Sequence, residues 1–366
     1  MATTKQLANA LLAKRERTRH TGESAVSSGS TLLNLACTDN PDFGFMKGGY
    51  YYLVGDSTSG KTWLSLSCFA EAAKSKAFKD YHLIFDDVEG GALMDVEHYF
   101  GKAVADRMEP PAFKNKQPVF SDTVESFYFH ITDRIKTGEP FIYVLDSQDA
   151  LGSASSAKKF EEHKAASQKG EVAAGSYGDG KAKYHSENIR VVLTGLRKTK
   201  SILIIIGQTR DNLGFGFEQK TRSGGKALRF YASMEIWTSV GGRIKKSVRA
   251  KERTIGAKCL AEVKKNRVTG KIGKDRQVQI PIYYDLGIDD VGSMVDFLIG
   301  EKHWKKIGGK ESKRFDAVDI LLEGSRNQII AHIEEENLEQ KIKGIVHKVW
   351  TEIEAASKPN RKRRYQ

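Results

Sequence analysis

The segment Gly55-Asp-Ser-Thr-Ser-Gly-Lys-Thr62 constrains the fold of this chain more than any other feature. It matches the phosphate-binding pattern G-x-x-x-x-G-K-[S/T], it follows the apolar run Tyr50–Val54, and a helical pattern over residues 63–76 comes after it. Glycines let successive backbone N–H groups point at an anion, and the helix adds its positive end at the same place. The sequence therefore predicts a strand–loop–helix unit that binds a nucleoside triphosphate.

This loop offers one side chain for the phosphates and one for a metal. Lys61 can reach the β- and γ-phosphates, and the hydroxyl of Thr62 can hold Mg²⁺. The alternative interpretation, a chance glycine-rich turn before a helix, fits this setting less well. We expect the rest of the pattern and the residue after it to surround the nucleotide: Gly55, Asp56, Ser57, Thr58, Ser59, Gly60 and Trp63.

The charge balance indicates which class of partner the chain binds. Among 366 residues, 59 lysines and arginines outnumber 46 aspartates and glutamates, for a formal net charge of +13. Such an excess is typical of proteins that meet nucleic acid, and less often a membrane surface. The longest apolar run, Ile202–Ile206, is far too short to span a bilayer, and residues 5–20 are basic and amphipathic rather than an apolar signal core. We therefore expect a nucleic-acid partner and no membrane.

The cysteines indicate the redox compartment. Cys37, Cys68 and Cys259 are widely separated, which suggests neither a disulfide framework nor a zinc site. We expect all three to be reduced packing residues of a cytoplasmic protein.

Strand-like and helical runs alternate from residue 50 to about residue 300. This alternation predicts an α/β fold with a mostly parallel sheet, and the close spacing of the later strands predicts an antiparallel extension. Two long stretches, residues 152–184 and 211–225, resemble mobile loops of the kind that carry function. The expected strands are Tyr50–Val54, His82–Phe85, Phe141–Leu145, Ile202–Ile206, Met234–Trp237, Leu260–Val263 and Val278–Tyr283.

Composition divides the chain into four parts. Residues 1–27 contain a short basic, amphipathic helical pattern, and residues 28–300 form the α/β core. Residues 301–357 are charged and amphipathic, notably over 328–356, and predict a small helical subdomain. Residues 358–366 form a basic tail that either only aids solubility or adds an electrostatic hold on DNA.

Two further strands end in acidic residues. Asp146 follows the apolar strand Phe141–Leu145, and in a phosphate-loop fold an acid at this point belongs to the Mg²⁺ shell. The strand beside the phosphate loop often supplies the base that orients the attacking water, and Glu89 is the best candidate. Asp86 and Asp87 are the alternative candidates for the base. A purely structural alternative is that an aspartate of this group caps a helix.

A fourth strand ends in Gln208, which can sense a γ-phosphate by hydrogen bonding and pass the signal to the next segment. That segment, residues 209–225, combines glycines and basic residues with the apolar Leu213, Phe215 and Phe217. Basic groups suit phosphates, and apolar groups can stack on bases. Composition alone supports a DNA-binding loop and a locally packed surface loop equally.

The order of these motifs resembles the RecA family of homologous-recombination ATPases. The likeness begins near Ser28-Gly-Ser-Thr-Leu-Leu and continues through the phosphate loop, Glu89, Asp146-Ser147 and Gln208-Thr-Arg210. It is most specific at Gly224-Gly-Lys-Ala-Leu-Arg-Phe-Tyr-Ala-Ser233 and Val263-Lys-Lys-Asn-Arg267. It covers residues 28–300 and extends more faintly to about residue 356.

The resemblance implies a role for each motif. Lys61 and Thr62 would bind ATP and Mg²⁺, Glu89 would activate water, and Asp146 would join the metal shell. Gln208 would report the γ-phosphate to the second DNA loop. The first DNA loop would correspond to about residues 175–184. The expected DNA-binding residues are Arg210, Leu213, Phe217, Lys220, Arg222, Gly224 and Gly225.

The resemblance also implies self-assembly. Lys265 and Arg267 match family positions that reach the ATP of an adjacent subunit, and Phe230 matches a position at the subunit interface. The segment 1–27 would serve polymerisation. ATP would therefore sit between subunits of a helical filament.

The chain departs from the family pattern at several points. Trp63 replaces a small residue, Arg267 replaces a lysine, and the tail is basic where bacterial RecA proteins usually have an acidic one. The segment between Asp146 and Gln208 is also longer than in the family. These differences suggest a divergent relative of the kind that phages carry.

We predict a DNA-dependent ATPase that forms filaments on single-stranded DNA and promotes homologous pairing with double-stranded DNA, in recombination and in the repair of DNA damage. The alternatives are a hexameric helicase-type DNA motor and a RecA-like recombination mediator with little ATP turnover. The helicase would normally need a further N-terminal domain. The pair Glu89 and Asp146 argues against the mediator.

Overall fold

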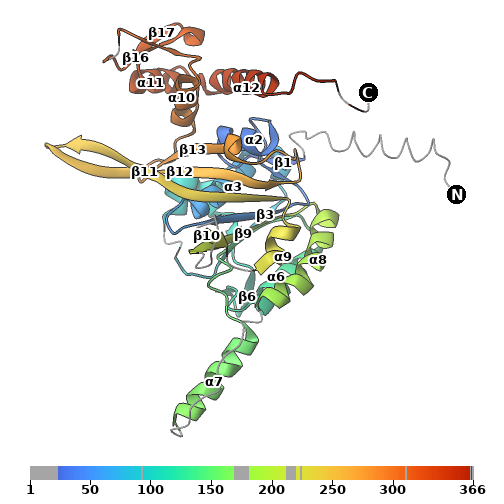
Figure 1. The fold of residues 1–366 in the computed structure, drawn as a ribbon. Coiled ribbons are helices and arrows are strands. Elements are labelled where there is room, and N and C mark those ends of the chain that lie inside the picture. The colour runs from blue at the N-terminus through green and yellow to red at the C-terminus, as the bar shows by residue number, and fades with distance from the viewer. Residues whose placement is uncertain are drawn as a thin grey trace.

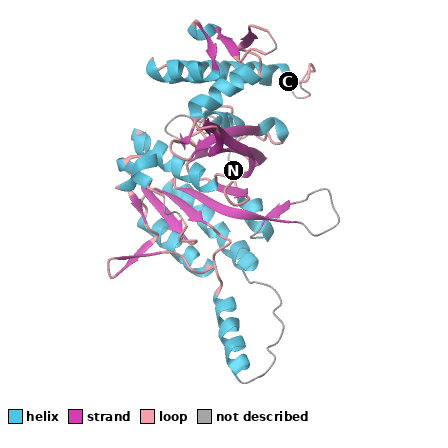
Figure 2. Ribbon diagram, turned by 90° about the vertical axis from the view of Figure 1, so that its left-hand side faces the viewer, coloured by secondary structure: helices cyan, strands magenta, loops and turns pink. Residues whose placement is uncertain are grey.

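A mixed sheet of ten strands organises the protein (Figures 1 and 2). The computed structural model describes residues 24–91, 94–168, 181–211, 220–222, 225–309, 311–362 and 364. The path order is β14-β13-β12-β11-β3-β9-β8-β4-β5, and β10 pairs with β9. The strands are β3 (Tyr50–Gly55), β4 (His82–Asp87), β5 (Met108–Glu109), β8 (Phe141–Asp146), β9 (Ile202–Asp211), β10 (Lys220–Arg222), β11 (Met234–Val248), β12 (Lys251–Asn266), β13 (Gln277–Tyr283) and β14 (Gly287–Ile288).

The predicted α/β fold is confirmed. Strands from β11 through β3, β9, β8 and β4 to β5 run parallel, whereas β11, β12, β13 and β14 pair antiparallel. All seven expected strands occur. Two are much longer than predicted, because β11 and β12 continue as a hairpin that projects from the body (Figure 1). The apolar pattern marks only the buried base of that hairpin, and its outer part is exposed and charged.

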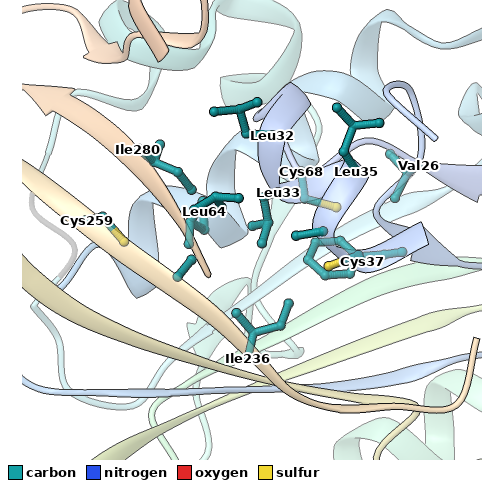
Figure 3. Packing of buried hydrophobic residues seen from close by; sticks show 14 of the residues in the cluster. Val26, Leu32, Leu33, Leu35, Cys37, Leu64, Cys68, Ile236, Cys259 and Ile280 are labelled. Carbon is teal, nitrogen blue, oxygen red and sulfur yellow. The ribbon is translucent and has the colours of Figure 1, made fainter. Parts of the chain in front are cut away.

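Both faces of the sheet are buried, which explains the unbroken apolar runs of its strands. Tyr51 and Leu53 of β3 pack into one cluster, and Tyr50 and Tyr52 pack into the other. Helices α2 (Thr31–Thr38) and α3 (Lys61–Lys74) contribute to the first cluster, which Figure 3 shows against Ile236 and Ile280. Helices α6 (Val124–Thr137), α8 (Lys181–Thr199) and α9 (Gly225–Tyr231) contribute to the second.

The three cysteines are packing residues, as predicted. Cys37, Cys68 and Cys259 are all buried in the first cluster (Figure 3). Burial raises the pKa of the Cys37 thiol to about 12, although the charge of Arg276 opposes this shift, so the group stays protonated at neutral pH.

A C-terminal subdomain lies at one end of the molecule, opposite helix α7 (Ala154–Gln168) (Figure 1). It contains α10 (Asp290–Gly300), α11 (Arg326–Glu335) and α12 (Glu339–Ala356), together with a three-stranded antiparallel sheet. The purely helical expectation therefore needs correction. The strands β15 (Lys305–Ile307), β16 (Arg314–Ala317) and β17 (Leu322–Ser325) are short and carry no apolar run that would mark them in the sequence.

Other differences concern local elements. Helix α7 occupies part of the stretch expected to be a loop, and α2 occupies a polar lead-in for which no helix was predicted. The N-terminal helical expectation lies mostly outside the described residues. The remaining elements are β1 (Ala25–Val26), β2 (Phe45–Met46), η1 (Lys76–Phe78), α4 (Val96–Phe100), α5 (Lys102–Ala105), β6 (Ala112–Lys114), β7 (Gln117–Val119), η2 (Lys274–Arg276) and η3 (Val318–Ile320). Among the described helices, none is both long and apolar enough to cross a bilayer.

A charge network ties the subdomain to the core. Arg276 is 3% exposed, and its guanidinium donates to Asp39 at 2.6 Å and to Glu354 of α12 at 2.5 Å. It also lies 5.2 Å from the ring centroid of Trp350. Lys271 bonds the same two carboxylates. The network therefore joins the end of α2, the connection between β12 and β13, and the last helix.

Candidate nucleotide site

The register of the parallel strands brings the predicted site residues together. Gly55 of β3 pairs with Gln208 of β9, and Asp87 of β4 pairs with Asp146 of β8. Because parallel strands end at the same edge of a sheet, their last side chains face one crevice. The four motifs read from separate parts of the sequence therefore converge at this edge.

The phosphate loop has the predicted strand–loop–helix form. β3 is buried along its whole length, Gly60 has a left-handed φ of 92° at the start of α3, and Lys61 opens that helix. The positive φ favours glycine there, and a Cβ would lie 2.7 Å from the end of the Ile282 side chain, which would have to shift. The ammonium of Lys61 donates to the carbonyl of Gly55 at 3.0 Å and to that of Asp56 at 2.6 Å.

Lys61 lies in an environment suited to an anion. Burial lowers the pKa of its ammonium group, while the nearby carboxylates Asp146, Glu89, Asp56 and Asp149 oppose that shift. The two carbonyls close the loop around this ammonium group. A phosphate that entered the loop would replace them as its partner and relieve the cost of burying the charge.

Thr62 and Asp146 form the oxygen-rich corner expected of a magnesium site. The Thr62 hydroxyl donates to Oδ2 of Asp146 at 2.6 Å. Burial raises the pKa of Asp146 to about 6, with Glu89 and Asp87 adding to the rise and Thr62 and Lys61 opposing it. A hydroxyl beside a carboxylate fits a hard cation such as Mg²⁺, which prefers oxygen ligands.

Glu89 lies just beyond the end of β4 and is held by two donors. The Ser147 hydroxyl donates to its Oε1 at 2.5 Å, and the Gln208 side-chain amide donates to the same oxygen at 3.2 Å. The expected base and the expected γ-phosphate sensor are therefore in direct contact. The peptide bond between Asp146 and Ser147 is cis.

The two alternative bases differ in position. Asp86 is fully buried and accepts bonds from the Ser121 backbone N–H and hydroxyl and from the Tyr143 hydroxyl, so its role is structural. Asp87 and Glu89 both line a cavity beside the phosphate loop. The structure therefore leaves Glu89 and Asp87 as candidates near the phosphate loop.

Two contacts that the sequence did not predict connect β9 to the site. Asp149 accepts a bond from the backbone N–H of Gln208 at 2.7 Å, and the Thr209 hydroxyl donates to Asp56 of the phosphate loop. The residue types alone give no sign of these contacts. The only signal in the sequence is position, because Asp149 lies three residues after Asp146 and Thr209 directly follows Gln208.

A cavity of about 360 Å³ opens beside the phosphate loop. The lining includes Asp87, Glu89 and Asp146, together with residues of β12, β13 and the projecting hairpin. Trp63, predicted to surround the nucleotide, lines this cavity. The complete lining is Thr58, Ser59, Gly60, Lys61, Thr62, Trp63, Asp87, Glu89, Gly91, Met94, Asp146, Arg243, Ala257, Lys258, Cys259, Ile282 and Tyr284.

Lys265 and Arg267 do not line this cavity. They gather at Phe230, which is 62% exposed at the end of α9. The Lys265 ammonium donates to the carbonyls of Arg229 and Phe230, and Arg267 donates to the carbonyl of Phe230. Burial lowers the pKa of Lys265 to about 8, and the charge of Arg267 adds to that shift. The two cations thus lie together on the surface around an exposed ring.

Those of the expected DNA-binding residues that the structure describes lie in β9, in β10 and at the start of α9. Leu213, Phe217 and Gly224 fall outside the described residues. Arg210 lies in β9, and Lys220 and Arg222 lie in β10, but their side chains are also outside the description. Gly225 begins α9 with a φ of 76°. Most of the expected first DNA loop is outside the described part, and its last residues, 181–184, begin α8.

Comparison with known proteins shows similarity to RecA proteins. A family model described as the RecA N-terminal domain matches residues 142–289, a range that includes Asp146, Gln208 and Lys265. "Protein RecA" of Cytophaga hutchinsonii is 28% identical over 278 residues, 74% of this chain and 67% of that protein. "Protein RecA" of Chloroherpeton thalassium is 27% identical over 335 residues, 87% and 83% respectively. "Protein RecA, plasmid" of Lactococcus lactis is 28% identical over 254 residues, 69% and 64%.

Proposed function

We propose that this chain is a divergent member of the RecA family and a DNA-dependent ATPase that forms helical filaments on single-stranded DNA. In this proposal it pairs that strand with homologous double-stranded DNA in recombination and repair, in the cytoplasm. The observation that carries the proposal is the contact between Glu89 and Gln208 beside the phosphate loop. It joins the group that would activate water to the strand that leads toward the DNA-binding segment.

Nucleotide binding rests on the phosphate loop. Lys61 would exchange its bonds to the Gly55 and Asp56 carbonyls for the β- and γ-phosphates. The start of α3 adds backbone N–H donors and the positive end of the helix dipole. Thr62 and Asp146 are the residues that would hold Mg²⁺, which neutralises phosphate charge when bound.

Hydrolysis rests on Glu89. Ser147 and Gln208 both donate to Oε1, so they fix the plane of the carboxylate. We assign the other oxygen, Oε2, as the acceptor of the proton from the attacking water. The positioning of that carboxylate by Ser147 keeps the base aligned before the nucleotide arrives.

Coupling to DNA rests on β9. Gln208 contacts Glu89 through its side chain and Asp149 through its backbone, and Thr209 contacts the phosphate loop. β9 then continues into the hairpin with β10, where the expected second DNA loop lies. A γ-phosphate that attracts Gln208 would move this strand end. Backbone contacts would supply most of the DNA affinity, so sequence preference should be low.

Assembly would complete the site. In this proposal the pair Lys265 and Arg267 contacts the nucleotide of a neighbouring copy, because neither residue lines the cavity of its own copy. The exposed ring of Phe230 beside them would be buried against that neighbour.

Steady-state ATP hydrolysis measured with and without single-stranded DNA tests the proposal. We expect DNA to stimulate turnover, Lys61→Ala to abolish it, and the matched surface variant Lys74→Ala on the same helix to leave it unchanged. Electron microscopy of the ATP-bound DNA complex is expected to reveal helical filaments. Closed rings would support the helicase-type alternative, and ATP binding without DNA-stimulated turnover would support the mediator.

A further inference from the structure

Two unlike groups of side chains line the cavity beside the phosphate loop. One group consists of the carboxylates Asp87, Glu89 and Asp146 together with Lys61. The other group is cationic and aromatic and includes Arg243 from the projecting hairpin and Tyr284 just after β13. A nucleotide also has two unlike parts, a charged phosphate chain and a flat base on a ribose.

Strand geometry explains how Arg243 reaches this cavity. Thr238 of β11 pairs with Gly55, the last residue of β3. β11 then continues for ten more residues as one arm of the hairpin, so Arg243 lies beyond the edge of the parallel sheet. Residues of the hairpin therefore line the same cavity as the phosphate loop.

Polar and ring contacts hold the aromatic group in place. Trp63 packs edge-to-face on Tyr99, with ring centroids 4.9 Å apart. The Tyr99 hydroxyl donates to the backbone carbonyl of Tyr284 at 2.7 Å, and the guanidinium of Arg243 donates to the Tyr284 hydroxyl at 3.4 Å. Gly287 backs the indole, since a Cβ there would lie 3.0 Å from the Trp63 ring. These contacts link Arg243 to the helix that starts at the phosphate loop.

We propose that Arg243 binds the base-and-ribose half of the nucleotide held by its own copy of the chain, beside Trp63 and Tyr284. This inference rests on the proposed function, because it assigns the second half of the same site. Within the described residues, no carboxylate forms an ion pair with Arg243, so its planar, cationic group can stack on a base or donate to its acceptor atoms. Phosphates would stay near Lys61 and Thr62.

The test compares a nucleotide with a phosphate chain that has no base. Isothermal titration calorimetry with Mg²⁺ gives the Kd of ADP and of inorganic tripolyphosphate for the full chain and for Arg243→Ala, Arg243→Lys and Arg253→Ala. Arg253 is an exposed arginine of the same hairpin that does not line the cavity. We expect Arg243→Ala to weaken ADP about 5- to 20-fold, as for the loss of one charged contact, with tripolyphosphate changed less than about twofold.

The other variants sharpen the result. Arg243→Lys should recover only part of the ADP affinity, because it keeps the charge and loses the planar group, and Arg253→Ala should match the parent chain. Unchanged ADP binding in Arg243→Ala overturns the inference, and so does an equal loss for tripolyphosphate, which would place the arginine on the phosphates. If the parent chain binds neither ADP nor tripolyphosphate, the proposed function is overturned as well. If the parent chain binds the two ligands with equal affinity, only this inference is overturned.

Discussion

Replacing Arg276 with alanine should destabilise the protein and loosen the C-terminal subdomain. The guanidinium holds Asp39 at the end of α2 and Glu354 in α12, and it lies over the ring of Trp350. Without it, two carboxylates would face each other with only Lys271 between them. The variant therefore combines lost attraction with new repulsion.

The magnitude follows from burial. Removing one partner of a fully buried ion pair costs about 3–5 kcal/mol. Here the arginine is 3% exposed but the carboxylates are 31% and 25% exposed, so water can compensate part of the loss. We expect a decrease of about 2–3 kcal/mol in the free energy of unfolding, which corresponds to about 3–4 °C in Tm for a chain of this size.

Thermal unfolding monitored by circular dichroism measures this change. Lys274→Ala is the matched control. The Lys274 ammonium lies 2.9 Å from the Glu262 carboxylate, but the lysine side chain is 76% exposed. Loss of this pair should therefore cost less than about 1 kcal/mol. If Arg276→Ala lowers Tm no more than this control does, the network does not stabilise the subdomain and the reasoning fails.

The same network predicts a pH dependence. Burial tends to raise the pKa of Asp39, but bonds from Lys271 and Arg276 outweigh it and lower the pKa below the usual value. A lowered folded-state pKa stabilises the protein above the unfolded value of about 3.9, and this contribution disappears as the pH falls through the folded value. In Arg276→Ala the Asp39 pKa should be lowered less, so acid unfolding should begin at a higher pH.

Three further predictions concern activity. Glu89→Gln should retain ATP binding and slow hydrolysis by about 10²–10⁴-fold, and near-normal turnover would reassign the base to Asp87. A mixture of Lys61→Ala and Lys265→Ala proteins should recover ATPase activity, because some interfaces then pair an intact Lys61 with an intact Lys265. If the two proteins are shown to assemble together and no mixing ratio recovers activity, the site is not shared. Removing residues 358–366 should make the slope of log affinity against log salt shallower, by up to about 0.9 per lost phosphate contact on duplex DNA, whereas an unchanged slope would mean that the tail is not on the DNA.

Local sequence patterns were enough to predict much of the fold and the centre of the site. The phosphate loop is contiguous, so its glycines, Lys61 and Thr62 appear in one short pattern. Seven strands of the central sheet are buried over much or part of their length, so each of these appears as an apolar run. Asp146, Glu89 and Gln208 stand at or just beyond the ends of such runs, where a parallel sheet places them on one edge.

Tertiary structure decided what depends on register and on the path of long elements. Ser147 and Gln208 meet on Glu89 because β4, β8 and β9 are adjacent in the sheet, and no short pattern records that order. Arg243 reaches the nucleotide cavity only because β11 continues past β3. The sequence alone determined which residues are candidates for phosphate chemistry, since that chemistry needs particular side chains at fixed local spacing. The folded sheet decided which distant side chains surround them, since those contacts arise between strands far apart in the chain.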